Sequence, residues 1–361
     1  MLTIPYDTSF RFRRNQDVKK IGLVGGTGYT GVELLRMLQD HPEVEILTLT
    51  SRSEAGKSVT SLYPWLTGYG AELVFAEPSS NALANCDLVF FATPNKIAME
   101  EAIPLLERGI QVIDLAADFR FSDADVWAAT YGGRHAAPTW NARAVYGLPE
   151  LYRDAIRGAQ LVGNPGCYPT ATTLPLAPLL KANMLSTDII VDAKSGASGA
   201  GRSARVDLIV AEASDNFHAY GADGHRHGPE IAHQLSRWSG QPIEVTFVPH
   251  LLPMIRGIEV TIYASINDGA TIDDVRQALH EAYADEPLID IVGEGIHPET
   301  RWVRGSNCCR IGVYQQHPGR LILSSVIDNL VKGAAGQAIQ NMNLMLGLDE
   351  WMGIPMRPLA P

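Results

Sequence analysis

Apolar residues in the first third of the chain occur in short continuous runs and in one helical pattern. The runs over 20–24 and 44–50 predict buried strands, and the stretch 32–38 between them has apolar residues at helical spacing. A glycine-rich turn joins the first strand to this helix. Strand, turn, helix and strand in this order form the opening unit of a doubly wound parallel sheet. Similar patterns predict strands over 86–92 and 111–115 and a helix over 96–108.

The pattern changes in the second half of the chain. Strands are predicted over 188–193, 243–248, 257–263 and 321–327. Apolar and polar residues alternate in several of them, which is typical of a mixed or antiparallel sheet with one covered face. Helices are predicted over 272–283 and over 329–346, the second one rich in small residues. We therefore expect an α/β protein that combines a Rossmann-type doubly wound parallel sheet with an α+β unit built on a mixed or antiparallel sheet.

Composition and charge limit the kinds of partner. The 361 residues are 46% hydrophobic and 19% charged, as in globular proteins long enough for two domains. The net charge of −11 argues against nucleic acid or an anionic membrane as the main partner. No apolar run approaches the length of a membrane span, and the first twenty residues lack the apolar core of a signal peptide. Four cysteines are too few for a disulfide framework, so we expect a cytoplasmic protein in a reducing compartment.

The turn after the first strand has the spacing of a dinucleotide-binding loop. It consists of Gly25, Gly26, Thr27, Gly28, Tyr29, Thr30 and Gly31. Glycines at positions 26, 28 and 31 let a diphosphate approach the helix N-terminus closely. A tight turn that binds nothing would have the same spacing, so the context of strand and helix carries the prediction.

The end of the second strand decides between NAD and NADP. A carboxylate at this place would bind the ribose 2′-hydroxyl of NAD. The sequence instead has Ser51, Arg52 and Ser53, whose hydroxyls and guanidinium suit a 2′-phosphate. We therefore expect NADP(H) as the cofactor. The alternative for these three residues is a solvated surface loop.

One cysteine lies at the mouth of an expected helix. Gly166 allows a sharp turn after an apolar strand, Cys167 follows, and a helix can begin at about Thr170. Unpaired backbone N–H groups and the positive end of the helix dipole would lower the pKa of the Cys167 thiol and make it a nucleophile. The same N–H groups can hold an oxyanion. The alternative is a buried cysteine that acts as a small apolar residue.

A dense polar segment over 224–231 contains His225, Arg226 and His227. In an extended segment the two histidines would point the same way and Arg226 the other way. A histidine near a thiolate can act as a general acid, because its pKa lies near neutrality. A metal site would lack a convincing third ligand, and a structural role is the remaining alternative.

Two further segments carry groups that suit an anion. The segment 194–202 has glycines, hydroxyls and flanking cations, which fit a phosphate or a carboxylate, or else a flexible surface loop. Arg120 follows the strand predicted over 111–115, at the sheet edge where such folds bind ligands. Its guanidinium could hold an oxyanion or pair with Asp118.

Taken together, these motifs resemble the N-acetyl-γ-glutamyl-phosphate reductase family, NADP-dependent enzymes of arginine biosynthesis. The motifs that carry the resemblance span 25–31, 163–170, 194–202, 225–231, 249–257 and 328–335. The resemblance implies an NADP-binding Rossmann domain over 1–165, of which 1–17 form an extension outside the match. It also implies a catalytic and dimerisation domain over 166–327 and a C-terminal helix over 328–361 that returns to the first domain.

The resemblance also implies roles for individual residues. Cys167 would be the nucleophile and His227 the acid/base, with His225 as the alternative. Besides the glycine turn and residues 51–53, the cofactor would contact Ser195, Gly196 and Asn329. The substrate would contact Arg120, Asn164, Ser198 and Arg202. The partners would be a small-molecule acyl phosphate and inorganic phosphate, and the assembly a homodimer or homotetramer without a metal.

The implied reaction begins with attack of the Cys167 thiolate on the acyl phosphate and loss of phosphate. NADPH then reduces the thioester to a semialdehyde. A related reductase acting on an aspartyl phosphate or an acylated aminoadipyl phosphate would use the same chemistry. A catalytically silent NADP-sensing module is a different class of protein, and it would lack a reactive thiol.

Overall fold

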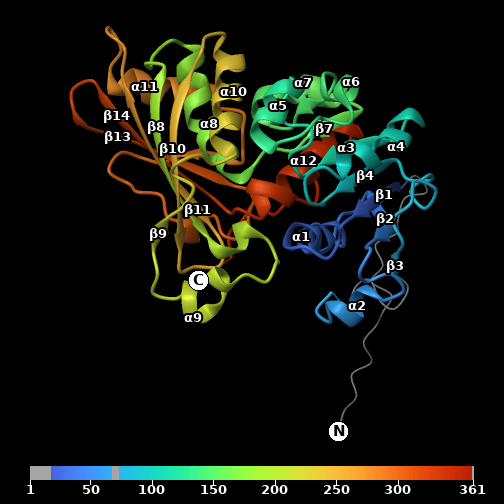
Figure 1. Cartoon of the computed structure of the whole chain (residues 1–361). Coiled ribbons are helices and arrows are strands. Elements are labelled where there is room, and N and C mark those ends of the chain that lie inside the picture. Colours follow the sequence, from blue (N-terminus) through green and yellow to red (C-terminus); the bar gives the residue numbers. More distant parts are fainter. Residues whose placement is uncertain (1–17, 67–72, 360–361) are drawn as a thin grey trace.

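The computed structural model describes residues 18–66 and 73–359 (Figure 1). The extension expected over 1–17 lies outside the described residues. Two seven-stranded sheets, each flanked by helices, organise the chain. The first sheet uses strands from the first half of the chain and the second uses strands from the second half. This is the α/β arrangement that the hydrophobic pattern predicts.

The first sheet is parallel throughout. Its order is β3-β2-β1-β4-β5-β7-β6, and every recorded strand pair runs in the same direction. The strands are β1 (Lys19–Val24), β2 (Val44–Thr50), β3 (Phe75–Ala76), β4 (Leu88–Phe91), β5 (Gln111–Asp114), β6 (Val145–Tyr146) and β7 (Leu161–Gly163). Because the order reverses at β1, the carboxyl ends of β1 and β4 border the crevice where doubly wound sheets bind nucleotides. The Rossmann-type sheet is confirmed.

The helices of the first sheet are short after α1. They are α1 (Tyr29–Leu38), α2 (Val59–Leu62), α3 (Ala98–Glu101), α4 (Ile103–Glu107), α5 (Ala124–Tyr131), α6 (Pro138–Asn141) and α7 (Pro149–Arg157). The helix predicted over 96–108 is present but interrupted, since α3 and α4 are separated at Ala102, which keeps helical backbone angles. Pro104 stands in the first turn of α4, where its missing N–H costs nothing, and it cannot continue the hydrogen bonding of α3.

The second sheet is mixed. Its order is β12-β13-β14-β11-β8-β10-β9, with β8 parallel to β10, β12 parallel to β13, and the other pairs antiparallel. The strands are β8 (Asp188–Gly196), β9 (His218–Ala219), β10 (Glu244–Leu252), β11 (Ile258–Ser265), β12 (Ile289–Ile291), β13 (Cys309–His317) and β14 (Arg320–Ile327). Burial alternates residue by residue along β11, so one face of the sheet is covered and the other is more open. The mixed sheet is confirmed.

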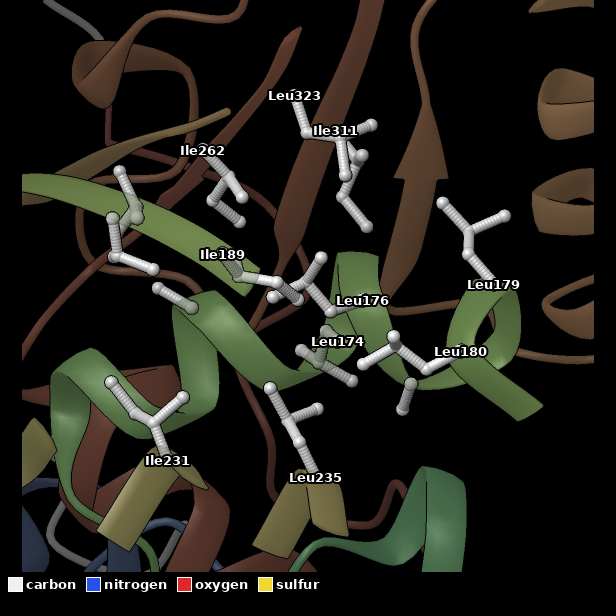
Figure 2. Close-up of a cluster of buried hydrophobic side chains, with 14 of the residues drawn as sticks. Leu174, Leu176, Leu179, Leu180, Ile189, Ile231, Leu235, Ile262, Ile311 and Leu323 are labelled. Carbon is white, nitrogen blue, oxygen red and sulfur yellow. The ribbon is translucent and has the colours of Figure 1, made fainter. Parts of the chain in front are cut away.

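Helices α8 (Cys167–Lys181), α10 (His227–Ser239) and α11 (Ile272–Ala282) belong to this second unit. Between α8 and α10 lie α9 (Val210–Ala213) and the 3₁₀ turns η2 (Ala197–Ala200) and η3 (Val206–Leu208), and a third 3₁₀ turn, η4 (Thr300–Trp302), follows α11. Figure 2 shows the core that α8 and α10 form with the strands, with Leu174, Leu176, Ile231, Leu235, Ile262 and Leu323 pointing into it. Each such fully buried side chain contributes about 1.5–3 kcal/mol relative to an exposed one. This core fixes the start of α8, where Cys167 lies.

The last helical segment packs against the first sheet. It consists of a π-helical turn, η5 (Val331–Ala335), followed by α12 (Gly336–Met345). Apolar residues of this segment share one buried cluster with residues of β1, β4 and α1. In Figure 1 the red α12 lies beside α7, an element far from it in sequence. None of the helices among the described residues is long and apolar enough to cross a membrane.

Candidate active site

Cys167 is the first residue of α8, directly after the N-cap Gly166. The helix predicted from about Thr170 thus begins three residues earlier, and the thiol does lie at a helix N-terminus. The pKa of the half-buried thiol is nevertheless raised, because burial outweighs the opposing effects of the Arg120 charge and of the Tyr168 backbone N–H. The expectation of a lowered pKa is wrong for the protein on its own. Cys167 is a thiol that needs a base.

The turn η5 packs directly behind Cys167. A Cβ atom added to Gly333 would lie 2.7 Å from the Cβ of Cys167, so only glycine fits at this position. Asn164 joins the same wall, since its Nδ2 donates to the Ala334 carbonyl at 3.2 Å and its Oδ1 accepts from Asn341 Nδ2 at 3.0 Å. Both ends of the Asn164 amide are thus bound within the chain. In this structure Asn164 holds the wall behind the cysteine, although the sequence suggested a substrate contact.

A buried ion pair lies next to the cysteine turn. Arg120 Nη1 is 3.1 Å from Glu230 Oε2, and both side chains are buried. Glu230 Oε1 also accepts from the Gly166 backbone N–H and from the Tyr146 hydroxyl, each at 2.9 Å. Glu230 therefore fixes both the guanidinium and the turn that presents Cys167.

Arg120 is held on three sides. Besides the pair with Glu230, its Nε donates to the Asn164 carbonyl at 2.8 Å and its Nη2 to the Leu115 carbonyl at 3.1 Å. Asp118 accepts instead from the backbone N–H groups of Lys96 and Met99, so the predicted alternative of an Arg120–Asp118 pair is wrong. The sequence did not single out Glu230 as a site residue. Its position three residues after His227 on one helix was the available signal.

The two histidines lie side by side, with ring centroids 4.9 Å apart. They are not in an extended segment, because His227 is the first residue of α10 and Arg226 before it has helical backbone angles. A Cβ on Gly166 would lie 2.7 Å from His227 Nε2 and 2.9 Å from Arg120 Nη1. The imidazole of His227 and the guanidinium of Arg120 therefore meet at the turn directly before Cys167.

Burial keeps both imidazoles neutral. The pKa of His227 lies well below its usual value because of burial, with smaller effects from His225 and two arginines. Burial also lowers the pKa of His225, to about 4. His225 Nδ1 accepts from the His227 backbone N–H at 3.2 Å, whereas His227 Nδ1 is buried and has no hydrogen-bond partner among the described residues. Nδ1 of His225 therefore has a partner within the chain, and Nδ1 of His227 has none among the described residues.

The glycine turn has the geometry of a phosphate-binding loop. Gly25 has φ +87°, which favours glycine, and a Cβ on Gly31 would lie 2.6 Å from the Gly25 carbonyl oxygen. A Cβ on Gly28 would meet nothing within 4 Å, so the turn is open at this point. Helix α1 has no side-chain N-cap and no acidic residue in its first turn. Its free N–H groups and the open turn fit a diphosphate.

Residues 51–53 lie at the carboxyl end of β2, next to the glycine turn. The hydroxyl oxygens of Ser51 and Ser53 are 3.5 Å apart. Arg52 is exposed, and its guanidinium pairs with the carboxylate of Glu101 at the end of α3. The two serine hydroxyls predicted to bind a 2′-phosphate are therefore close together, whereas the Arg52 guanidinium is held by the carboxylate of Glu101.

A second group forms where β8 ends. Asn329 Nδ2 donates to Ser198 Oγ at 2.9 Å, and Asn329 Oδ1 accepts from the Gly257 backbone N–H at 2.7 Å. Ser195 Oγ donates to the neighbouring Gly196 carbonyl at 3.0 Å. A Cβ on Gly199 would lie 2.9 Å from Ser195 Oγ and 3.7 Å from Asn329 Nδ2, so these side chains lie close together. The group thus combines residues that the sequence assigned to the cofactor with one, Ser198, that it assigned to the substrate.

Arg202 lies elsewhere. Its Nη1 donates to the Thr27 carbonyl at 3.0 Å and to the Tyr63 hydroxyl at 2.8 Å. The structure thus places Arg202 at the glycine turn. This position does not suggest the substrate contact that was expected.

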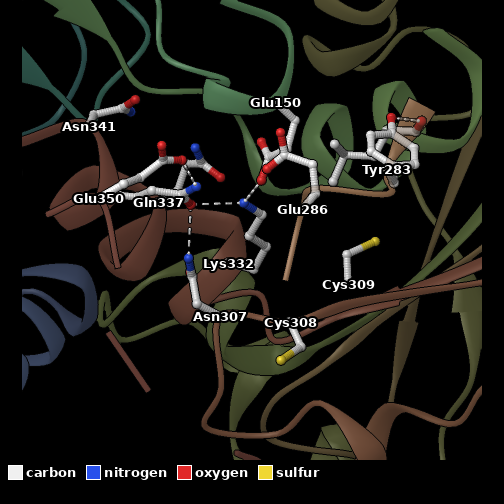
Figure 3. A network of polar contacts seen from close by, with 12 residues as sticks. Glu150, Tyr283, Glu286, Asn307, Cys308, Cys309, Lys332, Gln337, Asn341 and Glu350 are labelled. Atoms are coloured by element: carbon white, nitrogen blue, oxygen red, sulfur yellow. Dashed lines mark hydrogen bonds and ion pairs between the residues drawn. The ribbon is translucent and has the colours of Figure 1, made fainter. Parts of the chain in front are cut away.

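A buried polar network supports the turn behind Cys167 (Figure 3). Lys332 of η5 is fully buried and pairs with Glu150 at the start of α7. Its Nζ also donates to Gln340 Oε1 at 3.0 Å, and Asn307 Nδ2 donates to the same oxygen at 3.1 Å. The network ties η5 to α7, to α12 and to the segment before β13. The packing behind the cysteine therefore depends on charges that the solvent does not reach.

The other cysteines and possible metal ligands have no comparable setting. Cys86 and Cys309 are buried, and burial raises their pKa values to about 11 and about 12. Cys308 is half-buried and its Sγ contacts the Met356 carbonyl at 3.1 Å. No group of three or more His, Cys, Asp or Glu side chains in the described part of the chain is arranged to hold a metal ion. Cys167 differs from these three cysteines in lying at a helix N-terminus, close to the charge of Arg120.

Two family models match the two sheet units. The model described as semialdehyde dehydrogenase, NAD binding domain, matches residues 20–159, and the one described as semialdehyde dehydrogenase, dimerisation domain, matches residues 167–329. Solved structures of aspartate semialdehyde dehydrogenases are similar in fold. The enzyme II from Vibrio cholerae has a TM-score of 0.71 at 18% identity, covering 91% of this chain and 98% of that chain. The Candida albicans enzyme, solved with NADP, has a TM-score of 0.71 at 19% identity with the same coverage.

The fold and the cysteine site thus define a nicotinamide-dependent dehydrogenase of the semialdehyde class. N-acetyl-gamma-glutamyl-phosphate reductases are similar along nearly the whole sequence: that of Marinobacter nauticus is 55% identical over 95% of this chain and 99% of that protein. The reductase of Pseudomonas aeruginosa is 52% identical with the same coverage. The chain belongs to the N-acetyl-gamma-glutamyl-phosphate reductase family.

Proposed function

We propose that this protein reduces N-acetyl-γ-glutamyl phosphate to N-acetylglutamate semialdehyde with NADPH and releases phosphate. The observation that carries the proposal is the convergence of His227 Nε2 and Arg120 Nη1 on the turn that presents Cys167. A thiol, a neutral imidazole and a guanidinium are the groups that a covalent acyl transfer needs. The names of the relatives supply the substrate.

The first step is formation of a thioester. His227 takes the proton of the Cys167 thiol, because its imidazole is neutral and the raised pKa of the thiol leaves it protonated at rest. The sulfur attacks the acyl carbon, the bond from that carbon to the phosphate oxygen breaks, and phosphate leaves. Arg120 stabilises the negative charge on the sulfur before attack.

The second step returns the thiol. A reduced nicotinamide, when bound, would supply the hydride that the carbonyl carbon of the thioester accepts. Protonated His227 gives its proton to the oxygen of the resulting thiohemiacetal, and free N–H groups at the start of α8 stabilise the oxygen before it is protonated. His227 then removes the same proton, the carbon–sulfur bond breaks, and the semialdehyde leaves. The proton passes back from His227 to the Cys167 sulfur.

The cofactor proposed is NADP(H). The open glycine turn fits the diphosphate, and Ser51, Arg52 and Ser53 suit the 2′-phosphate. Asn329 and Ser198, with Ser195 and Gly196 beside them, are proposed to face the nicotinamide end. This assignment would require Asn329 to exchange one of its present partners for the carboxamide.

The proposed domain division follows the sheets. The proposed units are an NADP-binding domain over 1–165, of which 1–17 are an extension, a catalytic and dimerisation domain over 166–327, and a segment over 328–361 that returns to the first domain. A homodimer or homotetramer is proposed because one face of the mixed sheet is more open and the matching family model is described as a dimerisation domain. A reducing compartment, the cytoplasm, is proposed because the thiol of Cys167 must stay reduced.

The test is oxidation of the semialdehyde by NADP⁺ in the presence of inorganic phosphate, the reverse of the proposed reaction. Cys167→Ser should bind NADPH normally and lose turnover by a factor on the order of 10³ or more. Cys308→Ser is the matched control and should keep wild-type turnover. Turnover of the Cys167 variant near the wild-type rate would rule out the covalent route. A panel that includes aspartate semialdehyde and an acylated aminoadipate semialdehyde tests the substrate.

A further inference from the structure

We propose that Arg202 binds a phosphate group of the dinucleotide and thereby couples cofactor binding to the second structural unit. The inference rests on the proposed function, because it assumes that the glycine turn holds a nicotinamide dinucleotide. It assigns to the cofactor a residue that the sequence assigned to the substrate. The arginine lies in the segment between β8 and β9, and the turn that it contacts lies between β1 and α1.

Arg202 reaches from one unit to the other. Gly201 before it has φ +81°, which turns the chain out of η2. The guanidinium then donates through Nη1 to the Thr27 carbonyl and the Tyr63 hydroxyl, and its central carbon lies 5.6 Å from the centre of the Tyr63 ring. These contacts hold the cation directly at the glycine turn.

Both hydrogen-bond partners of Arg202 are neutral. Neighbouring arginines differ in this respect, since Arg205 pairs with Asp207 and Arg256 with Glu33. In the described ranges 18–66 and 73–359, no ion pair joins a carboxylate to Arg202. The pKa of Glu54 is lowered mainly by its hydrogen bond to Lys57 and in part by the charge of Arg202, so this carboxylate lies within electrostatic reach of the guanidinium. Its Nε and Nη2 groups remain as donors, and a guanidinium presents such donors in a planar fork that matches two oxygens of a phosphate.

A cleft brings the cation and the helix N-terminus together. Its volume is about 560 Å³, and its lining includes Tyr29 of α1, Ser198, Arg202 and Leu330. Tyr29 is the first residue of the uncapped helix α1, so the start of this helix and Arg202 border the same cleft. Ser198 lies in the same segment as Arg202 and bonds to Asn329, so an anion at Arg202 would steady the group proposed for the nicotinamide end.

The phosphate bound by Arg202 is either the 2′-phosphate or the diphosphate, and two cofactors distinguish them. NADPH carries both groups, and NADH carries only the diphosphate. Dissociation constants for both are measured by isothermal titration calorimetry on the full chain and on Arg202→Ala, Arg202→Lys and Arg205→Ala. Arg205 is the matched control, because it lines the same cleft and its charge is already neutralised by Asp207.

Arg202→Ala should weaken NADPH binding about tenfold or more, and lysine should restore part of the loss. If the 2′-phosphate is bound, NADH binding should be unchanged; if the diphosphate is bound, NADH should weaken by the same factor. Arg205→Ala should bind both cofactors like the wild type.

Unchanged NADPH binding by Arg202→Ala, while the wild type binds NADPH, would overturn this inference and leave the proposed function intact. A rise in the KM for the acyl substrate without a change in NADPH binding would also overturn it, in favour of a substrate contact. Absence of NADPH binding by the wild type would instead refute the proposed function itself.

Discussion

Replacing Glu230 with glutamine removes one negative charge beside Cys167 and nearly preserves the shape of the side chain. Glutamine can keep its carbonyl oxygen at the Oε1 position, where it accepts from Gly166 and Tyr146. Its amide group then takes the place of Oε2 and faces Arg120 Nη1, donor against donor. The substitution therefore isolates the ion pair from the two other hydrogen bonds.

The expected loss of stability follows from the contacts that Arg120 loses and those that it keeps. Breaking a buried ion pair by removing one partner costs about 3–5 kcal/mol. Arg120 retains its bonds to the carbonyls of Asn164 and Leu115, so we expect a loss near the lower end, about 3 kcal/mol in the free energy of unfolding. The substitution should also make Cys167 more reactive. The Glu230 charge raises the pKa of this thiol, so its removal should lower that pKa and speed alkylation at pH 7.

Two assays follow the two effects. Urea denaturation measures the unfolding free energy, and the rate of inactivation by iodoacetamide between pH 6 and pH 10 measures the thiol pKa. Glu281→Gln is the control, because Glu281 is exposed on α11 and bonds only to Gln277 among the described side chains. An unfolding free energy within 1 kcal/mol of the wild type, together with an alkylation midpoint that stays or moves upward, would refute the reasoning.

Three further predictions concern the surroundings of the site. Gly333→Ala should lower kcat by a factor on the order of 10–100, since its Cβ would push Cys167 aside; steady-state kinetics with wild-type turnover would contradict the packing. Lys332→Met should cost about 3–5 kcal/mol in urea denaturation by leaving Glu150 buried and unpaired, and adding Glu150→Leu should recover part of it; equal losses in both variants would contradict the pair. The free energy of unfolding should fall as the pH drops from about 6.5 towards 4, because His225 takes up a proton in the unfolded chain but not in the folded protein, where its pKa is about 4. Melting curves of His225→Gln should show a smaller fall over this range, and curves identical to those of the wild type would contradict the prediction.

Elements with a strong local pattern could be predicted from the sequence. The strands over 20–24 and 44–50 and the parallel sheet that they open are confirmed, because continuous apolar runs and a glycine turn are local signals. The start of helix α10 was not predicted, since the segment 224–231 was expected to be extended. Proline is tolerated in the first turn of a helix, where its missing N–H has no partner to lose, and α10 begins at His227.

The chemistry of the site was only partly predictable. The sequence places Cys167 at a helix N-terminus, which the structure confirms, but it does not show how much packing removes water from the thiol. Glu230 meets Arg120 and Gly166 from 110 and 64 positions away, so no local spacing reveals their contact. The place of Arg202 likewise depends on how one unit folds against the other.

The return of η5 and α12 has a consequence for synthesis on the ribosome. The strands of the parallel sheet have all been made once residue 163 has been added, but part of the apolar cover of that sheet comes from residues 331–345. Until translation is nearly complete, the parallel-sheet unit of the nascent chain is therefore incompletely folded and exposes apolar surface to chaperones and to other chains. A ribosome that stalls after β14 would release a polypeptide that has the fourteen strands of the described residues but lacks part of the apolar cover of its first sheet.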